Sequence, residues 1–180
     1  TATTRIYTLS LHDALPIFGV AEYGAGNGVV FGHGRLDIGA IQTPALIRHV
    51  KRHAKDDAIV ILDAPPGTSC PVIEAVKGVD FVLLVTEPTP FGLNDLELAV
   101  GMIRALGLPF AVIINRCDMG DNAVAQYCRR EGIDVAMEIP NQRKIAEAYS
   151  RGRMMVDVAP EYAGQFRGLY HRICGRAAVR

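Results

Sequence analysis

Unbroken apolar runs that end in polar residues constrain the fold of this chain more than any other feature. Three of them occupy residues 58–63, 81–86 and 110–115, and their apolar residues do not alternate with polar ones. Such runs are typical of strands buried on both faces of a parallel sheet. A weaker fourth run covers residues 134–139, and residues 29–31 form a short apolar stretch suited to another strand.

Segments with helical periodicity separate these runs. Helices are expected over residues 71–77, 93–106, 122–131 and 142–151, and glycine stands at the C-terminal ends of the last three, at positions 107, 132 and 152. Another helix is expected to start with Thr43 as its cap and Pro44 at the first helical position. The alternation predicts a three-layer α/β fold with a mostly parallel sheet.

Composition narrows the class of protein. The 180 residues are 49% hydrophobic, and 19 basic residues balance 19 acidic ones. This balance excludes a globally basic nucleic-acid binder, so nucleic acid is not expected as a partner. No apolar run reaches the roughly 18 residues of a membrane span. The four cysteines form no C-x-x-C pair, which gives no support to a zinc or cluster site, and single cysteines fit a cytoplasmic protein.

The first seventeen residues differ in character from the rest. The segment Thr1–Ile17 is polar, lacks a clear period and joins abruptly to a glycine-rich stretch. It resembles translated sequencing-adapter read-through, so we expect it to be foreign to the natural protein. Residues 18–180 are then expected to be the C-terminal part of a single domain whose natural N-terminal portion lies upstream.

The richest chemical signal begins at Asp63, the polar end of the first apolar run. A carboxylate at the end of a buried strand is suited to hold Mg²⁺ near a nucleotide, often through water, although it could equally cap the next helix. Pro65 and Pro66 fix the backbone after Asp63, and Gly67 lets the chain approach a ligand closely. The Gly67 amide could then donate to a γ-phosphate oxygen.

The string Ile-Leu-Asp-Ala-Pro-Pro-Gly-Thr-Ser-Cys-Pro-Val, residues 61–72, resembles the switch II segment of the MinD/ParA/Mrp P-loop ATPases. Within that group it is most similar to the MinD-superfamily ATPases with an inserted ferredoxin domain, and the resemblance runs from about Val29 to about Gly152. It implies a P-loop NTPase-like fold. It also implies that Asp63 is catalytic and holds Mg²⁺ through water, and that Pro66 and Gly67 border the γ-phosphate. Glu87 and Pro88 are expected to shape a loop near a dimer face.

Ile113-Ile-Asn-Arg116 is similar to a strand end of the same family. The resemblance implies that Asn115 reads an adenine edge, with Arg116 near the base or ribose, and that backbone at Pro140 lies over the base. Without the surrounding match, Asn115 would be better read as capping a loop. Asn115 to Asp118 also echoes the Asn-Lys-x-Asp motif for guanine, so GTP stays an alternative nucleotide.

The phosphate-binding loop itself is absent, because no G-x-x-x-x-G-K-[S/T] pattern occurs in the sequence. In the resembled family this loop and the ferredoxin insert with its 4Fe-4S cluster lie N-terminal to the matched region. We therefore expect an N-terminally truncated, P-loop NTPase-like chain that binds ATP weakly and does not hydrolyse it alone. Losing the first strand and helix is also expected to expose apolar surface and invite aggregation.

The intact protein is expected to be a cytoplasmic ATPase switch that binds ATP and Mg²⁺, forms a homodimer around ATP and acts on an unknown protein partner. The family includes iron-sulfur carriers, so a cluster carrier or scaffold ATPase is one alternative. A GTP-specific switch and a non-catalytic interaction domain are the others.

Two weaker features leave further alternatives. His49 and His53 stand four residues apart and could share a metal, but they lie in a basic segment, and a solvated helix face is the preferred interpretation. The tail from Pro160 to Arg180 has one apolar helical face. It is expected to dock on the sheet in preference to lying on a membrane surface.

Overall fold

The computed structural model describes residues 5–8, 19–26, 28–54 and 58–177. These residues fall into two compact units, Thr1–Lys77 and Gly78–Arg180, and each unit is described by itself. The expectation that residues 18–180 form one domain, with residues 1–17 foreign to it, stays a prediction. None of the described helices has both the length and the apolar character needed to cross a membrane.

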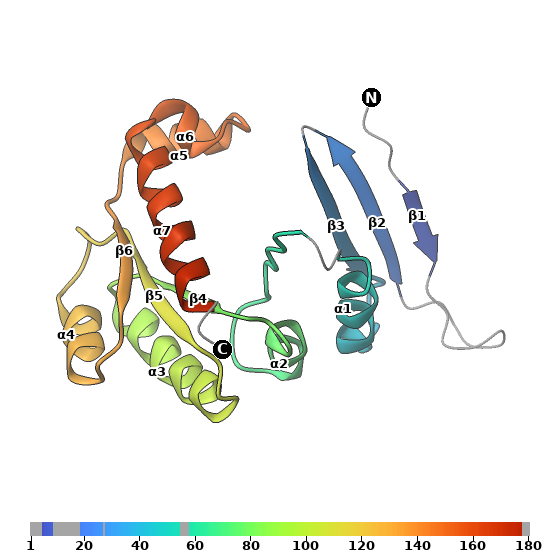
Figure 1. Cartoon of the computed structure of the whole chain (residues 1–180), viewed down its shortest axis with the longest axis horizontal. Coiled ribbons are helices and arrows are strands. Elements are labelled where there is room, and N and C mark those ends of the chain that lie inside the picture. The colour runs from blue at the N-terminus through green and yellow to red at the C-terminus, as the bar shows by residue number, and fades with distance from the viewer. Residues whose placement is uncertain (1–4, 9–18, 27, 55–57, 178–180) are drawn as a thin grey trace. The chain divides into compact units, whose positions relative to one another are not determined.

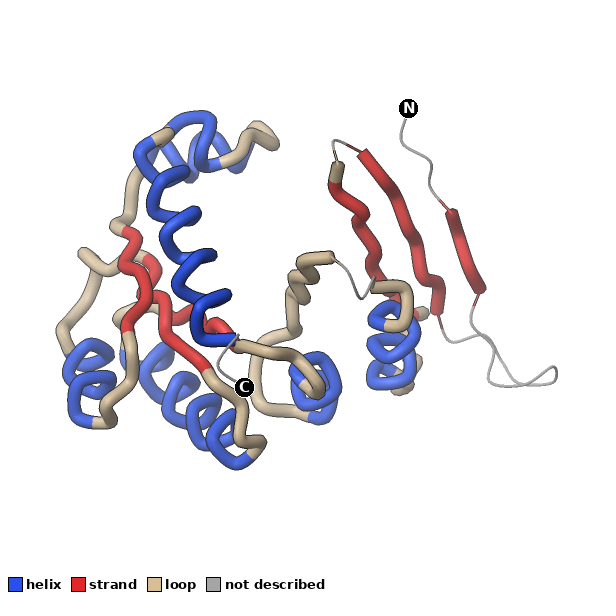
Figure 2. Tube along the Cα trace, viewed as in Figure 1, coloured by secondary structure: helices blue, strands red, loops and turns tan. Residues whose placement is uncertain are grey.

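The first unit is built on an antiparallel sheet of β1 (Arg5–Thr8), β2 (Gly19–Gly26) and β3 (Val29–Leu36), in that order. Figure 2 shows these strands beside α1 (Thr43–Lys51). The predicted strand at 29–31 is the start of β3, which pairs with β2 through a turn at Gly28. Leu46 of α1 and Ala21 of β2 are buried together and form the small core of this sheet and helix.

Helix α2 (Cys70–Val76) completes the first unit and is joined to α1 by a lysine. The Lys51 ammonium donates to three carbonyl oxygens at the end of α2, those of Glu74 at 3.0 Å, Ala75 at 2.9 Å and Lys77 at 2.7 Å. These carbonyls lack partners within the helix, and a cation at a helix C-terminus also meets its negative dipole end. Burial lowers the pKa of Lys51, and the opposing effect of the Glu74 carboxylate is smaller.

The predicted buried strand at residues 58–63 is wrong. This segment has no regular secondary structure, and Ile59, Val60 and Ile61 are 69%, 46% and 89% exposed. A parallel strand requires neighbours that complete its ladder of hydrogen bonds, and none of the described strands pairs with this segment. The apolar run therefore lies unpaired on the surface.

The second unit has the predicted α/β architecture. Its parallel sheet has the order β4 (Val82–Thr86), β5 (Phe110–Asn115) and β6 (Val135–Ile139). The connecting helices are α3 (Pro90–Ala105) and α4 (Ala123–Arg130), followed after β6 by α5 (Arg143–Ser150), α6 (Met155–Val158) and α7 (Glu161–Ala177). The glycines at 107, 132 and 152 all have positive φ, as expected where helices end.

Both faces of this sheet are covered, which makes three layers (Figure 1). Val112 and Ile114 of β5 pack with α3 and α4 through Leu96, Val100, Val124, Tyr127 and Cys128. Ile113, between them in sequence, faces the other way and packs with Met137 of β6 and Leu169 of α7. This alternation explains why the run 110–115 has no polar residue before Asn115.

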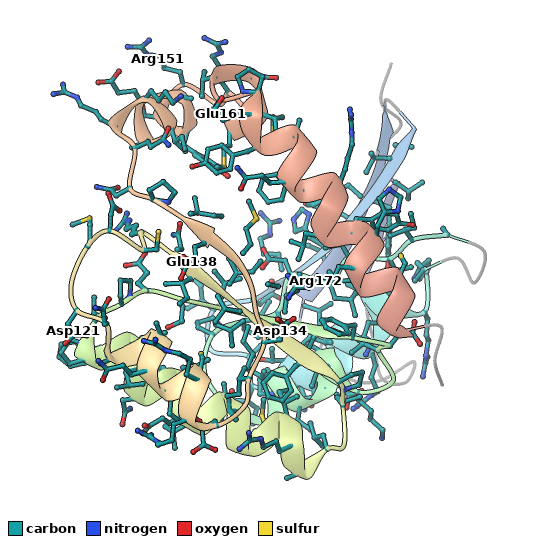
Figure 3. All side chains as sticks on the ribbon, turned by 60° about the vertical axis from the view of Figure 1, so that its left-hand side comes forward. Asp121, Asp134, Glu138, Arg151, Glu161 and Arg172 are labelled. Carbon is teal, nitrogen blue, oxygen red and sulfur yellow. The ribbon has the colours of Figure 1, made fainter. Side chains whose placement is uncertain are left out.

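The C-terminal helix docks on the sheet, as preferred from the sequence. Its Tyr162 and Leu169 are buried, and Phe166 and Ile173 pack against the same cluster. Arg172 fixes the helix further by donating to Ala136 O at 3.2 Å and by pairing with the Asp134 carboxylate, which lies beside it in Figure 3. The apolar face is thus occupied by the protein's own sheet.

Candidate functional site

The carboxyl ends of β4 and β5 carry polar residues at one edge of the parallel sheet. Thr86 ends β4 and Glu87 follows it, while Asn115 ends β5. An open hollow of about 360 Å³ lies there, lined by Val85, Thr86, Glu87, Thr89, Gly92, Asp95 and Asn115. In open α/β sheets this edge is where ligands bind, so the hollow is the candidate site of the second unit.

Glu87 faces two side chains from the end of the neighbouring strand. One of its carboxylate oxygens accepts from Asn115 Nδ2 at 3.5 Å, and the other lies 3.5 Å from Arg116 Nη1. The Glu87 and Arg116 side chains are 40% and 52% exposed, so this ion pair adds at most about 1 kcal/mol to stability. The contact instead affects side-chain orientation, because the Glu87 carboxylate faces both the Asn115 amide and the Arg116 guanidinium.

The loop that carries Glu87 is held by its own backbone and two threonines. Thr89 accepts from Gly92 N at 3.0 Å and caps α3, and Thr86 Oγ1 donates to Gly92 O at 2.9 Å. A Cβ at Gly92 would lie 2.2 Å from Glu87 O, so only glycine fits beside that carbonyl. The loop therefore presents the Glu87 side chain from a fixed backbone.

Arg116 has a strained backbone. Its φ is 51°, the only positive value of a non-glycine residue in the part of the chain that the structure describes. The neighbouring turn maintains it, because Met119 N donates to Arg116 O at 2.9 Å and Cys117 N donates to Ile139 O at 3.0 Å. Left-handed backbone costs an ordinary residue about 1–2 kcal/mol, and such residues cluster at functional sites.

Pro140 directly follows β6, whose last residue Ile139 is paired with Asn115. The loops after β5 and β6 are tied together by Asp118, whose carboxylate accepts from Asn141 N at 2.6 Å. The structure thus brings together Asn115, Arg116 and Pro140, three of the residues predicted to bind nucleotide. Asp118, which the guanine alternative requires to read a base, has one oxygen committed to this backbone bond.

The other predicted site residues lie in one loop of the first unit. Asp63, Pro66 and Gly67 are all exposed in the segment that precedes α2. Gly67 has φ of 92°, which an L-residue rarely adopts, and open space surrounds the position of its missing Cβ. Glycine at this turn is thus required by backbone conformation, and a ligand could approach its amide freely.

Asp63, Pro66 and Gly67 could hold Mg²⁺ only together with ligands from outside the chain. Among the described residues, no group of three or more histidine, cysteine or acidic side chains could hold a metal ion. Mg²⁺ is commonly held by one or two carboxylates together with waters and substrate phosphates. Exposed Asp63 would suit that arrangement when phosphates supply the remaining ligands, and it could not form a metal site alone.

The link between Glu87 and Asn115 was missed by sequence reasoning, which assigned Glu87 only a role in shaping a loop. A signal was present, because Glu87 follows one strand and Asn115 ends the next, so both belong to the same edge of a parallel sheet. That rule places the residues near each other but does not determine which way either side chain points.

The structure places His49 in α1 and His53 in the turn that follows this helix. The His49 and His53 rings lie 4.9 Å apart, and His53 Nδ1 is 2.8 Å from the Tyr23 hydroxyl. Burial lowers the pKa of His49, and the neighbouring His53 and Arg52 lower it further. His49 Nε2 is buried without a hydrogen-bond partner among the described residues. The lowered pKa favours a neutral His49 imidazole, and the described residues supply no third metal ligand beside the two histidines.

Comparison with known proteins supports the resemblance at a distance. An uncharacterized protein of Methanocaldococcus jannaschii is 30% identical over 121 residues, which cover 66% of this chain and 42% of that protein. The iron-sulfur cluster carrier proteins of Pyrococcus abyssi and Aquifex aeolicus are 28% and 26% identical over 132 and 117 residues. These matches cover 63% and 57% of this chain.

The chain spans less than half the length of the curated relatives it matches, 44% of the Pyrococcus abyssi protein and 32% of the Aquifex aeolicus protein. No family model and no solved structure matches the chain.

Proposed function

We propose that this chain is the C-terminal, base-binding part of a MinD/ParA/Mrp-type ATPase that works in iron-sulfur chemistry. The observation that carries the proposal is the meeting of Asn115, Arg116 and Pro140 beside a hollow at the carboxyl edge of a parallel sheet. An amide, a guanidinium and a loop backbone at half-buried Pro140 are groups that can hold a nucleobase and its ribose.

The two loops have separate tasks in this proposal. Asn115 and Arg116 hold the adenine and ribose, and backbone at Pro140 covers the base. Considered by itself, the loop of the first unit would offer the Gly67 amide to a γ-phosphate, and Asp63 would hold Mg²⁺ through water and position an attacking water. The metal would supply charge neutralisation at the phosphates. Because the sequence has no phosphate-binding loop, the chain by itself is expected to bind ATP weakly and not to hydrolyse it.

The iron-sulfur part of the proposal rests on the relatives named as cluster carriers. Cys128 gives it little support, since this residue is buried against α3 and β5 and burial raises its thiol pKa. We place the 4Fe-4S cluster in a portion upstream of this chain, with a cytoplasmic homodimer formed around ATP. A cluster carrier, for which the cluster is cargo, is the second candidate, favoured by the same names.

A side-by-side titration tests the nucleotide. The ¹⁵N-labelled chain is titrated with ATP, GTP and CTP while the Asn115 side-chain amide and the backbone amide of Asn141 are followed. We expect ATP to shift both signals at lower concentration than GTP, and CTP to have little effect. Tighter binding of GTP would remove the adenine assignment, and the absence of any shift at Asn115 would refute the proposed site.

Hydrolysis is tested in the chain as it stands. We expect no phosphate release with ATP and Mg²⁺, and an Asp63→Ala variant should be indistinguishable from the unmodified chain. Turnover by this chain that disappears in Asp63→Ala would contradict the expectation that the missing loop is essential.

A further inference from the structure

Among the residues that line the hollow, Glu87 makes contacts that affect how a neighbouring side chain is oriented. It comes from the loop after β4, while both groups it faces come from the end of β5, 28 and 29 positions further along the chain. An ionised carboxylate only accepts hydrogen bonds, so Glu87 can engage the donor atoms of Asn115 and Arg116 but not the Asn115 carbonyl oxygen. The contact therefore distinguishes between the two ends of the Asn115 amide.

The orientation of Asn115 decides which purine edge it can read. With its NH₂ group directed at Glu87, Asn115 leaves its acceptor Oδ1 outside this contact, and a ligand of the hollow could donate to it. Adenine has a 6-amino donor where guanine and hypoxanthine have the acceptor O6. An acceptor on the protein therefore pairs with adenine and opposes the other two bases, whereas a rotated amide would do the reverse.

We propose that Glu87 is a positioning residue that sets the purine preference of this site by holding the Asn115 amide with its acceptor toward the base. The inference rests on the proposed function, because it assumes that the hollow takes a purine nucleotide. It adds a determinant of specificity that acts through Asn115 and does not touch the base.

Two features make Glu87 suited to this task. Its backbone is fixed, because Thr89 N donates to Glu87 O at 2.8 Å and Gly92 packs against the same carbonyl. The following Pro88 is buried. The Glu87 carboxylate is half-exposed, and its contacts with Asn115 and Arg116 are long. The stability of the fold therefore depends little on these contacts. A substitution at Glu87 is thus expected to change orientation while preserving the fold.

Asp95 provides a matched control. It lines the same hollow and carries the same charge, but its carboxylate accepts from the adjacent Asn94 Nδ2 at 3.4 Å. Replacing Asp95 by Asn changes the charge of the hollow as much as Glu87→Gln does, without changing the partner of Asn115. Any purely electrostatic effect on a triphosphate should be equal in the two variants.

The experiment compares ATP with inosine triphosphate, which has a 6-oxo group and a protonated N1 where adenine has a 6-amino group and an unprotonated N1. Dissociation constants are measured by titrating the full chain and following backbone amides near Pro140, with circular dichroism as the check of folding. We expect the native chain to prefer ATP, so that the dissociation constant for inosine triphosphate exceeds that for ATP. Glu87→Gln can donate to Asn115 Oδ1 and turn the amide, and we expect it to reduce this ratio of dissociation constants about five- to tenfold. Glu87→Ala should bring it toward one, Glu87→Asp should partly restore it, and Asp95→Asn should leave it unchanged.

Three results would overturn the proposal. Equal binding of the two nucleotides by the native chain would refute the role of Glu87 and leave the proposed function standing. The same holds if Glu87→Gln and Glu87→Ala weaken both nucleotides equally, because Glu87 would then be only a structural residue. If the native chain binds neither nucleotide, the proposed function itself fails, and this inference fails with it.

Discussion

Arg116 shows how a single residue can be held in an unfavourable conformation beside the candidate site. Its left-handed backbone is an intrinsic cost that a glycine would not bear. We expect Arg116→Gly to raise the free energy of unfolding of the second unit by about 0.5–1 kcal/mol while weakening ATP binding.

Urea unfolding followed by circular dichroism measures this effect. Arg153→Gly is the matched control, because Arg153 is exposed and its backbone does not have positive φ. That substitution should be neutral or slightly destabilising. A stability loss in Arg116→Gly as large as that in Arg153→Gly would show that the turn, and not strain, dominates at Arg116.

His49 gives the first unit a dependence on pH. Because burial, His53 and Arg52 lower its pKa in the folded protein, the unfolded chain binds a proton first as the pH falls below the ordinary value of 6.5. The contribution to stability is complete above pH 6.5 and is lost as the pH falls toward the lowered pKa. We expect a lower melting temperature of the first unit at pH 5.5 than at pH 7.5.

His49→Gln should reduce this pH dependence, and His171→Gln, a change on the exposed side of α7, should not. Thermal melting followed by circular dichroism at both pH values measures the slopes. Equal slopes in the native chain and in His49→Gln would exclude His49 as the cause.

Among the elements, helix α3 contains two glycines with opposite roles. Gly101 lies in open space, so Gly101→Ala should stabilise the helix by about 0.5–1 kcal/mol through propensity and lower chain entropy. Gly92 adjoins Glu87 O so closely that Gly92→Ala must move the loop, with an expected loss of about 1–3 kcal/mol. Urea unfolding of both variants, with the Asn115 amide signal as the local readout, tests the pair. Similar stability changes in the two would contradict the described packing.

The elements also show how far sequence reasoning reaches. Strand β5 was predicted at its observed bounds. An unbroken apolar run of this length suits a strand that is covered by helices on both faces, and β5 is covered in this way. Thr43-Pro44 was expected to cap a helix, yet Thr43 is the first helical residue and Gln42 makes no side-chain cap bond. The same dipeptide at Thr89-Pro90 does cap α3 through the Thr89 side chain. The helix begins at Pro90, three residues before its predicted start at residue 93. Local sequence marks a helix start without fixing which residue makes the bond.

The site followed the same division. Asn115, Arg116 and Pro140 were assigned from the family resemblance, and their role in nucleotide binding stays a prediction; that they lie at one edge agrees with the rule that the carboxyl ends of parallel strands share an edge. Strand 58–63 failed because its apolar sequence meets the needs of a buried strand, while burial depends on partners that sequence periodicity cannot supply. The facing of Glu87 toward Asn115 depends on side-chain rotation, which no spacing rule specifies.

At the scale of the whole molecule, large apolar side chains are exposed in both described units, and in the first unit they form two consecutive runs. The strand β3 and the segment before α2 expose large side chains, namely Val29, Val30, Phe31, Ile59, Val60 and Ile61. The second unit also exposes large apolar side chains, such as Val85 and Phe91, although it has continuous cores on both sides of its sheet. A surface with this many apolar side chains favours association with other apolar surfaces.

We therefore expect the chain to bind the dye ANS and to aggregate as its concentration rises. A double variant, Ile59→Lys with Ile61→Lys, should lower ANS fluorescence and light scattering while preserving the circular dichroism spectrum, because both side chains already lie in solvent. Leu96→Lys, a change in the core of the second unit, should unfold that unit. Loss of helical signal in the double variant would show that the exposed segment is structurally required.

The bond between Asp118 and Asn141 N has a thermodynamic consequence for any ligand of this edge. It fastens the two loops after β5 and β6 to each other before anything binds, so a flat ring resting on Pro140 would meet Asn115 at a preset spacing. Entropy that would otherwise be lost in bringing two mobile loops into register has then already been spent during folding. Asp118→Ala would remove this hydrogen bond while Asn115 and Pro140 remain in place. We expect the variant to associate with a ligand more slowly and to bind it more weakly.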